Sequence, residues 1–122
     1  MTKHKIFYNL DGHIEIKISG RLNDRDVVEI GKKIVSLSTE IEDSGRTVKI
    51  LIDSSRIKGW TEQVYRLLMI IIKDINFEKS ASYCINQEFY NLLHRVAAGT
   101  GIGDRARNFN NRQAAQAWLS ED

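Results

Sequence analysis

Residues 48–72, VKILIDSSRIKGWTEQVYRLLMIII, decide the fold of this chain. The opening VKILI is apolar at all but one position and mostly β-branched, which predicts a central strand that is buried more than the two strands before it. From Val64 onward apolar residues recur at helical spacing, which predicts a strongly apolar helix. The polar segment between them, residues 53–61, is expected to be a turn, and turns at such positions commonly carry function.

A β-hairpin is predicted ahead of this stretch. Residues 6–10 form a β-prone run, and Asp11-Gly12 follows, a dipeptide preferred in two-residue hairpin turns because both positions tolerate positive φ. In the next strand Ile14, Ile16 and Ile18 alternate with polar residues. This period of two predicts one buried face and one face largely in solvent.

The longest helix is predicted between Asn23 and Gly45. Asn23 is a favourable N-cap, and Gly45 is a natural stop. Between them apolar residues recur at steps of three and four along one face, at Val27, Ile30, Ile34, Leu37 and Ile41.

The helix after the central strand carries more apolar surface than one interface requires. Thr61 is expected to cap it, with Trp60 and Tyr65 at the spacing of a hydrophobic staple. Its core stripe is Val64, Leu68, Ile71, Ile72 and Ile75. Three more apolar residues fall outside that stripe: Leu67, Met69 and Ile70. This helix is therefore expected to be deeply buried or to make a second contact.

The rest of the chain completes an alternating pattern. Residues 81–85 predict a strand, Asn86 is expected to cap a third helix, and residues 105–109 predict a polar edge strand. Asn110 begins a capping-box pattern ahead of a short closing helix. The order is ββαβαβαβα, and right-handed crossovers make the strands after the hairpin largely parallel. We predict one α/β domain over residues 1–122, with a mixed sheet of four to five strands and helices mainly on one face.

This pattern resembles the SpoIIAA-like, or STAS, domains, named for sulfate transporters and anti-sigma factor antagonists. The resemblance covers nearly the whole chain and rests on the opening hairpin, on the segment ILIDSSRIKGW and on the closing FNNRQAAQAWL. The closing segment looks like the ending of the single-domain bacterial STAS-like branch. The resemblance implies a sheet of four or five strands backed by helices, with a functional loop before the second helix.

The same resemblance raises the question of a phosphorylation switch. In anti-sigma factor antagonists the second helix opens with D-S-S-G, and the first serine is phosphorylated by a partner kinase. Alignment on Asp53 puts TEQ, residues 61–63, where D-S-S would fall, so the phosphoacceptor serine is missing there. Glu62 is interpreted as an acidic residue in the first helical turn, where the helix dipole favours it. The remaining phosphorylation candidates are Ser54, Ser55 and Thr61.

Composition and charge argue against several classes of function. The net charge of +2 is too small, and no basic run is long enough, to indicate nucleic-acid binding. A single cysteine, Cys84, excludes an intrachain disulfide; it is interpreted as a small buried hydrophobe, with a reactive thiol as the alternative. The longest apolar run, residues 67–72, is far short of a membrane span, and residues 1–12 have no signal-peptide core. A cytoplasmic location without membrane insertion is expected.

The candidate site lies in the predicted turn and the helix after it. Asp53, Ser54 and Ser55 follow the carboxyl end of a parallel strand, where ligands of open α/β sheets commonly bind; ordinary turn hydrogen bonding is the alternative. Trp60 is either a staple or partial core residue, or an exposed contact for a ligand or partner. The full set of candidate residues is Asp53, Ser54, Ser55, Gly59, Trp60, Thr61, Leu67, Met69 and Ile70.

No catalytic or metal-binding constellation can be assembled from the sequence. The histidines His4, His13 and His94 are far apart and have no carboxylate or cysteine at ligand spacing, so no metal is expected. No nucleophile, base and orienting group occur together, so neither an enzyme nor a cofactor is expected. We expect a regulatory or binding domain that engages a protein partner, or a second copy of itself, through residues 53–61 and the following helix. The alternative is a carrier or sensor of a small apolar ligand held between the second helix and the sheet, beside Trp60.

Overall fold

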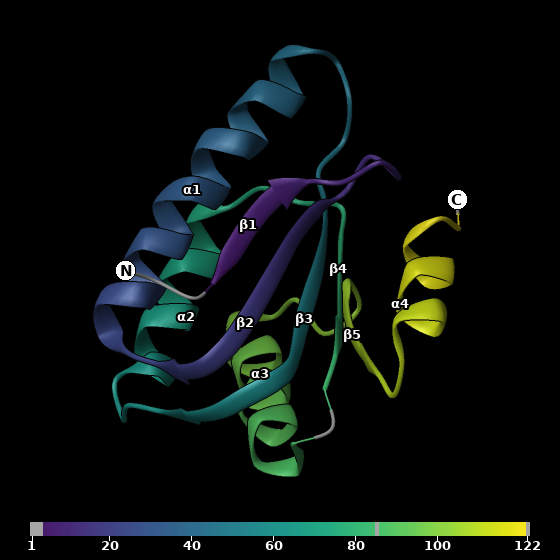
Figure 1. Cartoon of the computed structure of the whole chain (residues 1–122). Helices are drawn as coiled ribbons and strands as arrows, with labels where there is room; N and C mark the ends of the chain where they lie inside the picture. The colour runs from purple at the N-terminus through teal and green to yellow at the C-terminus, as the bar shows by residue number, and fades with distance from the viewer. Residues whose placement is uncertain (1–3, 85, 122) are drawn as a thin grey trace.

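The predicted order of elements is confirmed by the computed structural model, which describes residues 4–84 and 86–121 (Figure 1). The elements are β1 (Lys5–Tyr8), β2 (Ile14–Leu22), α1 (Asp24–Asp43), β3 (Lys49–Trp60), α2 (Val64–Asp74), β4 (Lys79–Tyr83), α3 (Gln87–Thr100), β5 (Ala106–Phe109) and α4 (Arg112–Leu119). Ile85, which the sequence places in the fourth strand, lies outside the described residues.

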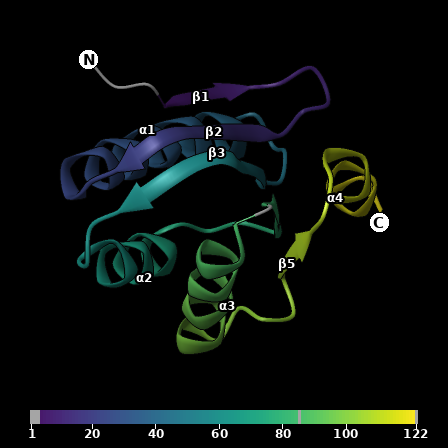
Figure 2. The ribbon, with the colours of Figure 1, turned by 60° about the horizontal axis from the view of Figure 1, so that its bottom comes forward.

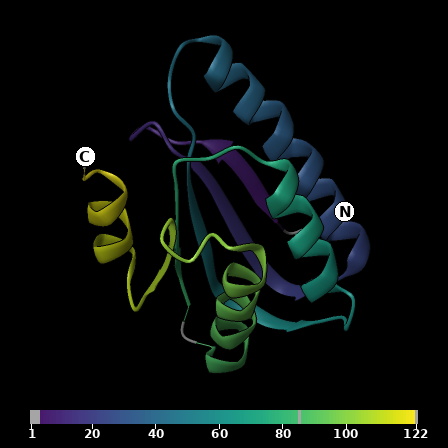
Figure 3. The ribbon, with the colours of Figure 1, turned by 180° about the vertical axis from the view of Figure 1, so that it is seen from behind.

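The five strands form a single mixed sheet in the order β1-β2-β3-β4-β5. β1 pairs antiparallel with β2, and the remaining neighbours are all parallel. Because each strand lies beside the next one along the chain, every right-handed crossover places its helix on the same face. Helices α1, α2 and α3 therefore cover one face, and α4 alone packs against the other (Figures 2 and 3). The prediction of helices mainly on one face is confirmed.

The main hydrophobic core lies between the sheet and α1, α2 and α3. The isoleucines of β2 and the predicted stripe of α1 enter it as expected, and Leu37 packs at its edge. A smaller core on the opposite face consists of Leu51, Ala81, Ala115 and Leu119, which are all buried beneath or within α4. β3 thus contributes side chains to both cores, which explains why the central strand is apolar at nearly every position.

The N-terminal cap of α1 is the one predicted. The Asn23 side chain accepts a hydrogen bond from the Asp26 N–H (2.9 Å), and the Asp26 carboxylate accepts one from the Asn23 N–H (3.1 Å). These reciprocal bonds satisfy backbone donors that the first helical turn leaves without partners. The helix ends at Asp43, and Gly45 follows with a φ of 81°.

The predicted cap of α3 is confirmed, because the Asn86 side chain accepts a hydrogen bond from the Phe89 N–H (3.0 Å). The remaining two predicted caps are displaced. α2 begins after Gln63, which makes no side-chain cap bond, while the Thr61 hydroxyl donates instead to the Asp24 carboxylate. The cap of α4 is Asn111, whose side chain accepts from the Ala114 N–H (2.8 Å), rather than Asn110. The error at α4 is a shift by one residue between two adjacent asparagines, which give the same local cap pattern.

The hairpin turn is longer than predicted. The last paired residues are Tyr8 and Ile14, so residues 9–13 form the loop. The Asn9 side-chain oxygen accepts hydrogen bonds from the N–H groups of Asp11 and His13, both at 3.0 Å. This side chain therefore organises a wider loop, in which Gly12 adopts a φ of 84°.

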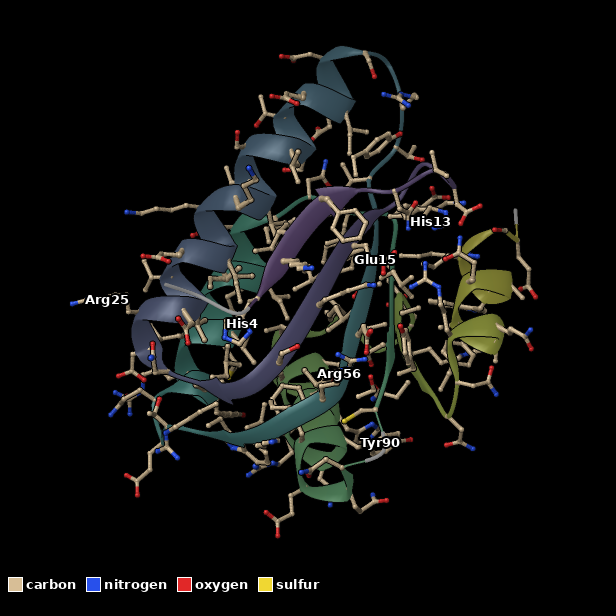
Figure 4. The ribbon with its side chains drawn as sticks, viewed as in Figure 1. His4, His13, Glu15, Arg25, Arg56 and Tyr90 are labelled. Carbon is tan, nitrogen blue, oxygen red and sulfur yellow. The ribbon has the colours of Figure 1, made fainter. Side chains whose placement is uncertain are left out.

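The prediction of a solvated second face for β2 is wrong at the start of that strand. Glu15 is only 1% exposed, and its neighbour His13 is buried as well. Both residues point to the side of the sheet on which α4 packs (Figure 4). Lys17, further along the strand, does face solvent. Among the described residues, no helix is long and apolar enough to cross a membrane.

Candidate ligand-binding site

The segment 53–61 is mostly a strand, so the predicted turn is wrong. β3 continues to Trp60 and stays paired with β2, with Ser19 beside Arg56 and Leu22 beside Trp60. Two register shifts interrupt this pairing. The extension exists because β2 is long enough to supply partners for backbone groups that would otherwise face solvent.

Asp53, Ser54 and Ser55 are engaged in local bonds. The Asp53 carboxylate accepts hydrogen bonds from the N–H (3.0 Å) and the hydroxyl (2.6 Å) of Ser55. Burial raises the pKa of the Asp53 carboxyl, but hydrogen bonds from Ser55 and Tyr83 outweigh it, so the pKa lies below its ordinary value. Ser54 has no exposed surface, and its hydroxyl donates to the Tyr83 carbonyl oxygen (3.4 Å).

Trp60 is half-buried at the edge of the main core. Its ring packs edge-on against Phe89 of α3, with centroids 5.1 Å apart. Gly59 precedes it, and a Cβ placed there would lie 3.5 Å from the Arg21 guanidinium. The tryptophan therefore joins the end of β3 to α3.

The apolar excess of α2 is used mainly for helix packing. Val64 is buried, but the rest of the helix is half-buried or exposed, so the deep burial predicted as one option is absent. Leu67 and Met69 pack against the core, and the Met69 Cε lies 2.9 Å from the position of a Cβ on Gly99 of α3. Ile70 remains 52% exposed. Of the three residues outside the stripe, Met69 thus makes the second contact predicted from the sequence, against α3.

A cavity of about 360 Å³ lies between the sheet and the three helices that cover it. Its inner wall is made by isoleucines of β2, β3 and α1 and by four residues of the predicted core stripe: Leu68, Ile71, Ile72 and Ile75. None of the candidate residues chosen from the sequence, all of which the structure describes, lines this cavity. Phe89 does line it, so Trp60 is one ring removed from the cavity.

The cavity reaches the surface beside α3. Its exposed lining residues are His94, Ala98, Gly103 and Arg107, which belong to α3, to β5 or to the segment between them. Ser80 of β4 and Arg107 of β5 are polar lining residues as well. The cavity is also lined by four further polar side chains on β4, α3 and β5: Ser82, Tyr90, His94 and Asn108. We call these four residues the polar rim. Sequence reasoning missed them because they are isolated polar residues on three different elements.

An ion pair with a buried carboxylate, that of Glu15, occupies the opposite face of the sheet. Arg112 of α4 donates two hydrogen bonds to the Glu15 carboxylate, at 2.6 and 2.8 Å, and Asn9 donates a third at 3.0 Å. Burial raises the pKa of the Glu15 carboxyl, but these hydrogen bonds outweigh it and the pKa falls below its ordinary value. Burial and the nearby Lys49 charge also lower the pKa of His13. The sequence held one signal of this burial: the apolar side of α4 has to pack against a face of the sheet, and that face carries Glu15 and His13.

Other reactive groups are dispersed. Within the described residues, no three His, Cys, Asp or Glu side chains are placed to hold a metal ion. His4 lies against the Asp26 carboxylate at 3.2 Å and accepts from the Ser19 N–H. Cys84 is buried, with its Sγ 3.6 Å from the Ser54 carbonyl oxygen.

Solved structures share this fold, although no family model matches the sequence and no curated protein matches it either. One is an uncharacterised protein of the DUF3478 family from Shewanella loihica PV-4, which has a SpoIIAA-like fold. Its TM-score is 0.67 at 21% sequence identity, and the match covers 95% of this chain and 91% of that one. The unphosphorylated anti-sigma factor antagonist SpoIIAA has a TM-score of 0.60 at 13% identity, covering 91% of each chain.

The phosphorylated form of SpoIIAA, a Bacillus cell fate determinant, is similar to the same degree. Its TM-score is 0.61 at 15% identity, and the match covers 94% of this chain and 98% of that one. The chain therefore has the SpoIIAA-like fold, as the resemblance of its sequence implied. At these identities the likeness concerns the fold alone.

Proposed function

We propose that this domain binds a small apolar molecule in the cavity between the sheet and α1, α2 and α3. The observation that carries the proposal is the cavity itself, at about 360 Å³. Protein interiors are normally close-packed, with few voids larger than a water molecule. Pockets of roughly 300–1,000 Å³ are typical of small-molecule sites.

The chemistry of the wall supports an apolar occupant. An apolar cavity of roughly 150 Å³ stays dry and takes up benzene, because water finds no hydrogen-bonding partners inside. The inner wall here consists of aliphatic side chains such as Ile16, Ile34 and Leu68. Filling such a space restores dispersion contacts and stabilises the folded state.

The binding test uses the position of Trp60. Trp118, the second tryptophan, lies against Phe109 on the far side of the sheet, so a Trp118→Phe variant leaves Trp60 as the reporter beside Phe89. Benzene and the 1-alkanols from hexanol to dodecanol are titrated into this variant while fluorescence and Tm are recorded. We expect a saturable fluorescence change and a rise in Tm for at least part of the series.

A filled-cavity variant provides the control. Ala97 lines the cavity from α3, so Ala97→Phe is expected to abolish both responses. Ala117→Phe, on the exposed side of α4, adds the same ring elsewhere and is expected to leave them intact. No response to any compound, or equal responses in the two variants, would reject the proposal.

A contact with a protein partner or a second copy is the second candidate function. The observation in its favour is Ile70, whose side chain projects from α2 into solvent. Residues 53–61 support a partner contact less than the sequence led us to expect, because most of them belong to strand β3 and form local hydrogen bonds. Native mass spectrometry of the wild type and of Ile70→Lys tests a self-contact; a monomer in both samples at high concentration would remove it.

A further inference from the structure

We infer that the ligand is an amphiphile whose apolar body fills the inner cavity and whose single uncharged, hydrogen-bonding head group contacts the polar rim. This inference rests on the proposed function, since it names the chemistry of a ligand in the same cavity. It is carried by the distribution of polar side chains along the cavity wall.

The polar rim converges from both sides of the opening. Ser82 and Asn108 are register partners in β4 and β5, so they stand side by side on the same face of the sheet. Tyr90 and His94 are one turn apart on α3 and therefore project from the same side of that helix. Tyr90 is labelled in Figure 4. A head group at the opening would meet both the strand pair and the helix.

Ser82 offers a hydroxyl to a polar group inside the cavity. It is only 5% exposed and lines the cavity, yet no hydrogen bond to its hydroxyl is found among the residues that the structure describes. The same holds, within that part of the chain, for the side chains of Tyr90, His94 and Asn108. Among the described residues, the fully enclosed side-chain atom that lacks a partner is Gln116 Oε1 of α4, so the Ser82 hydroxyl is open to the cavity, where a ligand oxygen or nitrogen can bond to it.

The charges around the rim favour an uncharged head group. Within the described residues, no carboxylate lines the cavity. The Arg107 guanidinium lies over the Trp118 ring at 5.2 Å, on the α4 side of the sheet. A cationic head group would therefore find no carboxylate on the described wall, and an anionic one would find the Arg107 guanidinium already engaged with Trp118. A hydroxyl or amide matches the donors and acceptors that Ser82 and Asn108 offer.

The inner end of the cavity fits the apolar body. Away from the rim the wall passes from β4 to β3 and β2 and then to α1, where the lining residues Val27, Ile30 and Ile34 are all buried. No polar side chain of α1 or β2 joins this part of the described wall. An alkyl chain anchored at the rim would therefore extend toward α1.

The experiment compares head groups on one tail in the otherwise wild-type Trp118→Phe protein at pH 8. The probes are 1-decanol, decanoate and decyltrimethylammonium, with benzene as a probe that lacks a head group. We expect decanol to bind at least tenfold more tightly than either ion. Decanol affinity should fall about two- to tenfold in Ser82→Ala and in Asn108→Ala, the size of one lost hydrogen bond.

Two comparisons separate this inference from the proposed function. Benzene affinity should be unchanged in Ser82→Ala, and Ser36→Ala, an exposed serine of α1, should leave decanol affinity unchanged. Benzene binding together with equal affinities for decanol and the ions would overturn the inference and leave the proposed function standing. Failure of benzene and decanol alike would overturn both. The comparison of head groups uses a protein in which the polar rim is not substituted, so its result remains valid even if a rim variant does not fold.

Discussion

Arg112, the first residue of α4, holds Glu15 of β2 in a two-pronged ion pair, although the two residues are 97 positions apart in the sequence. The Glu15 side chain is 2% exposed and that of Arg112 is 42% exposed. At the other end of α4, Lys49 donates to the Leu119 carbonyl oxygen and Lys79 to that of Trp118. Charged side chains thus attach both ends of α4 to the sheet, and the lysines lie where the helix dipole favours positive charge.

Replacing Arg112 should destabilise the fold strongly. Arg112→Leu leaves the Glu15 carboxylate buried without its main partner, so we expect the free energy of unfolding to fall by about 2–4 kcal/mol. Urea unfolding followed by circular dichroism measures this. The double variant Glu15→Leu/Arg112→Leu removes both charges and should recover much of the loss; a double variant as unstable as the sum of the single changes would contradict this account.

Acid should weaken the fold through the same carboxyl group. The pKa of Glu15 is lower in the folded state than its ordinary value of 4.5, so its contribution to stability is present above about pH 4.5 and is lost as the pH falls through the lower folded pKa. We expect Glu15→Gln to lose less stability than the wild type between pH 6 and pH 3 in urea titrations. Asp53, whose pKa is also lowered, should account for part of the loss that remains.

Two helical glycines should respond oppositely to alanine. A Cβ on Gly31 would lie 2.8 and 2.9 Å from the Cδ1 and Cγ1 of Ile71, a stiff β-branched side chain, so Gly31→Ala should cost about 1 kcal/mol after the gain in helix propensity. On Gly99 the Cβ would meet the flexible end of Met69, so Gly99→Ala should gain up to about 1 kcal/mol. Thermal and urea unfolding measure the change in the free energy of unfolding for each variant. If both variants changed it equally, the contact between Gly31 of α1 and Ile71 of α2 would not be tight.

The capping box of α1 should be worth a measurable amount. Asn23→Ala removes the acceptor for the Asp26 N–H and should lower the free energy of unfolding by about 1 kcal/mol. Asn23→Gly is the matched control, because glycine at an N-cap costs only a few tenths of a kcal/mol. Equal stability of the alanine variant and the wild type would mean that water replaces this cap at no cost.

Local patterns in the sequence determined the order and type of the elements. The alternation of Ile14, Ile16 and Ile18, the stripe of α1 and the Asn23 cap act over a few residues, so they are legible without any tertiary contact. Right-handed crossovers then led from that order to the mixed sheet with three helices on one face.

Tertiary structure alone decided which polar residues are buried and where space remains. Glu15 is polar within an alternating strand, and its burial depends on Arg112, far along the chain. The segment after Asp53 reads as a turn locally but pairs as a strand because β2 extends beside it. The cavity depends on how closely three helices approach one sheet, a sum of many side-chain volumes that no short pattern encodes.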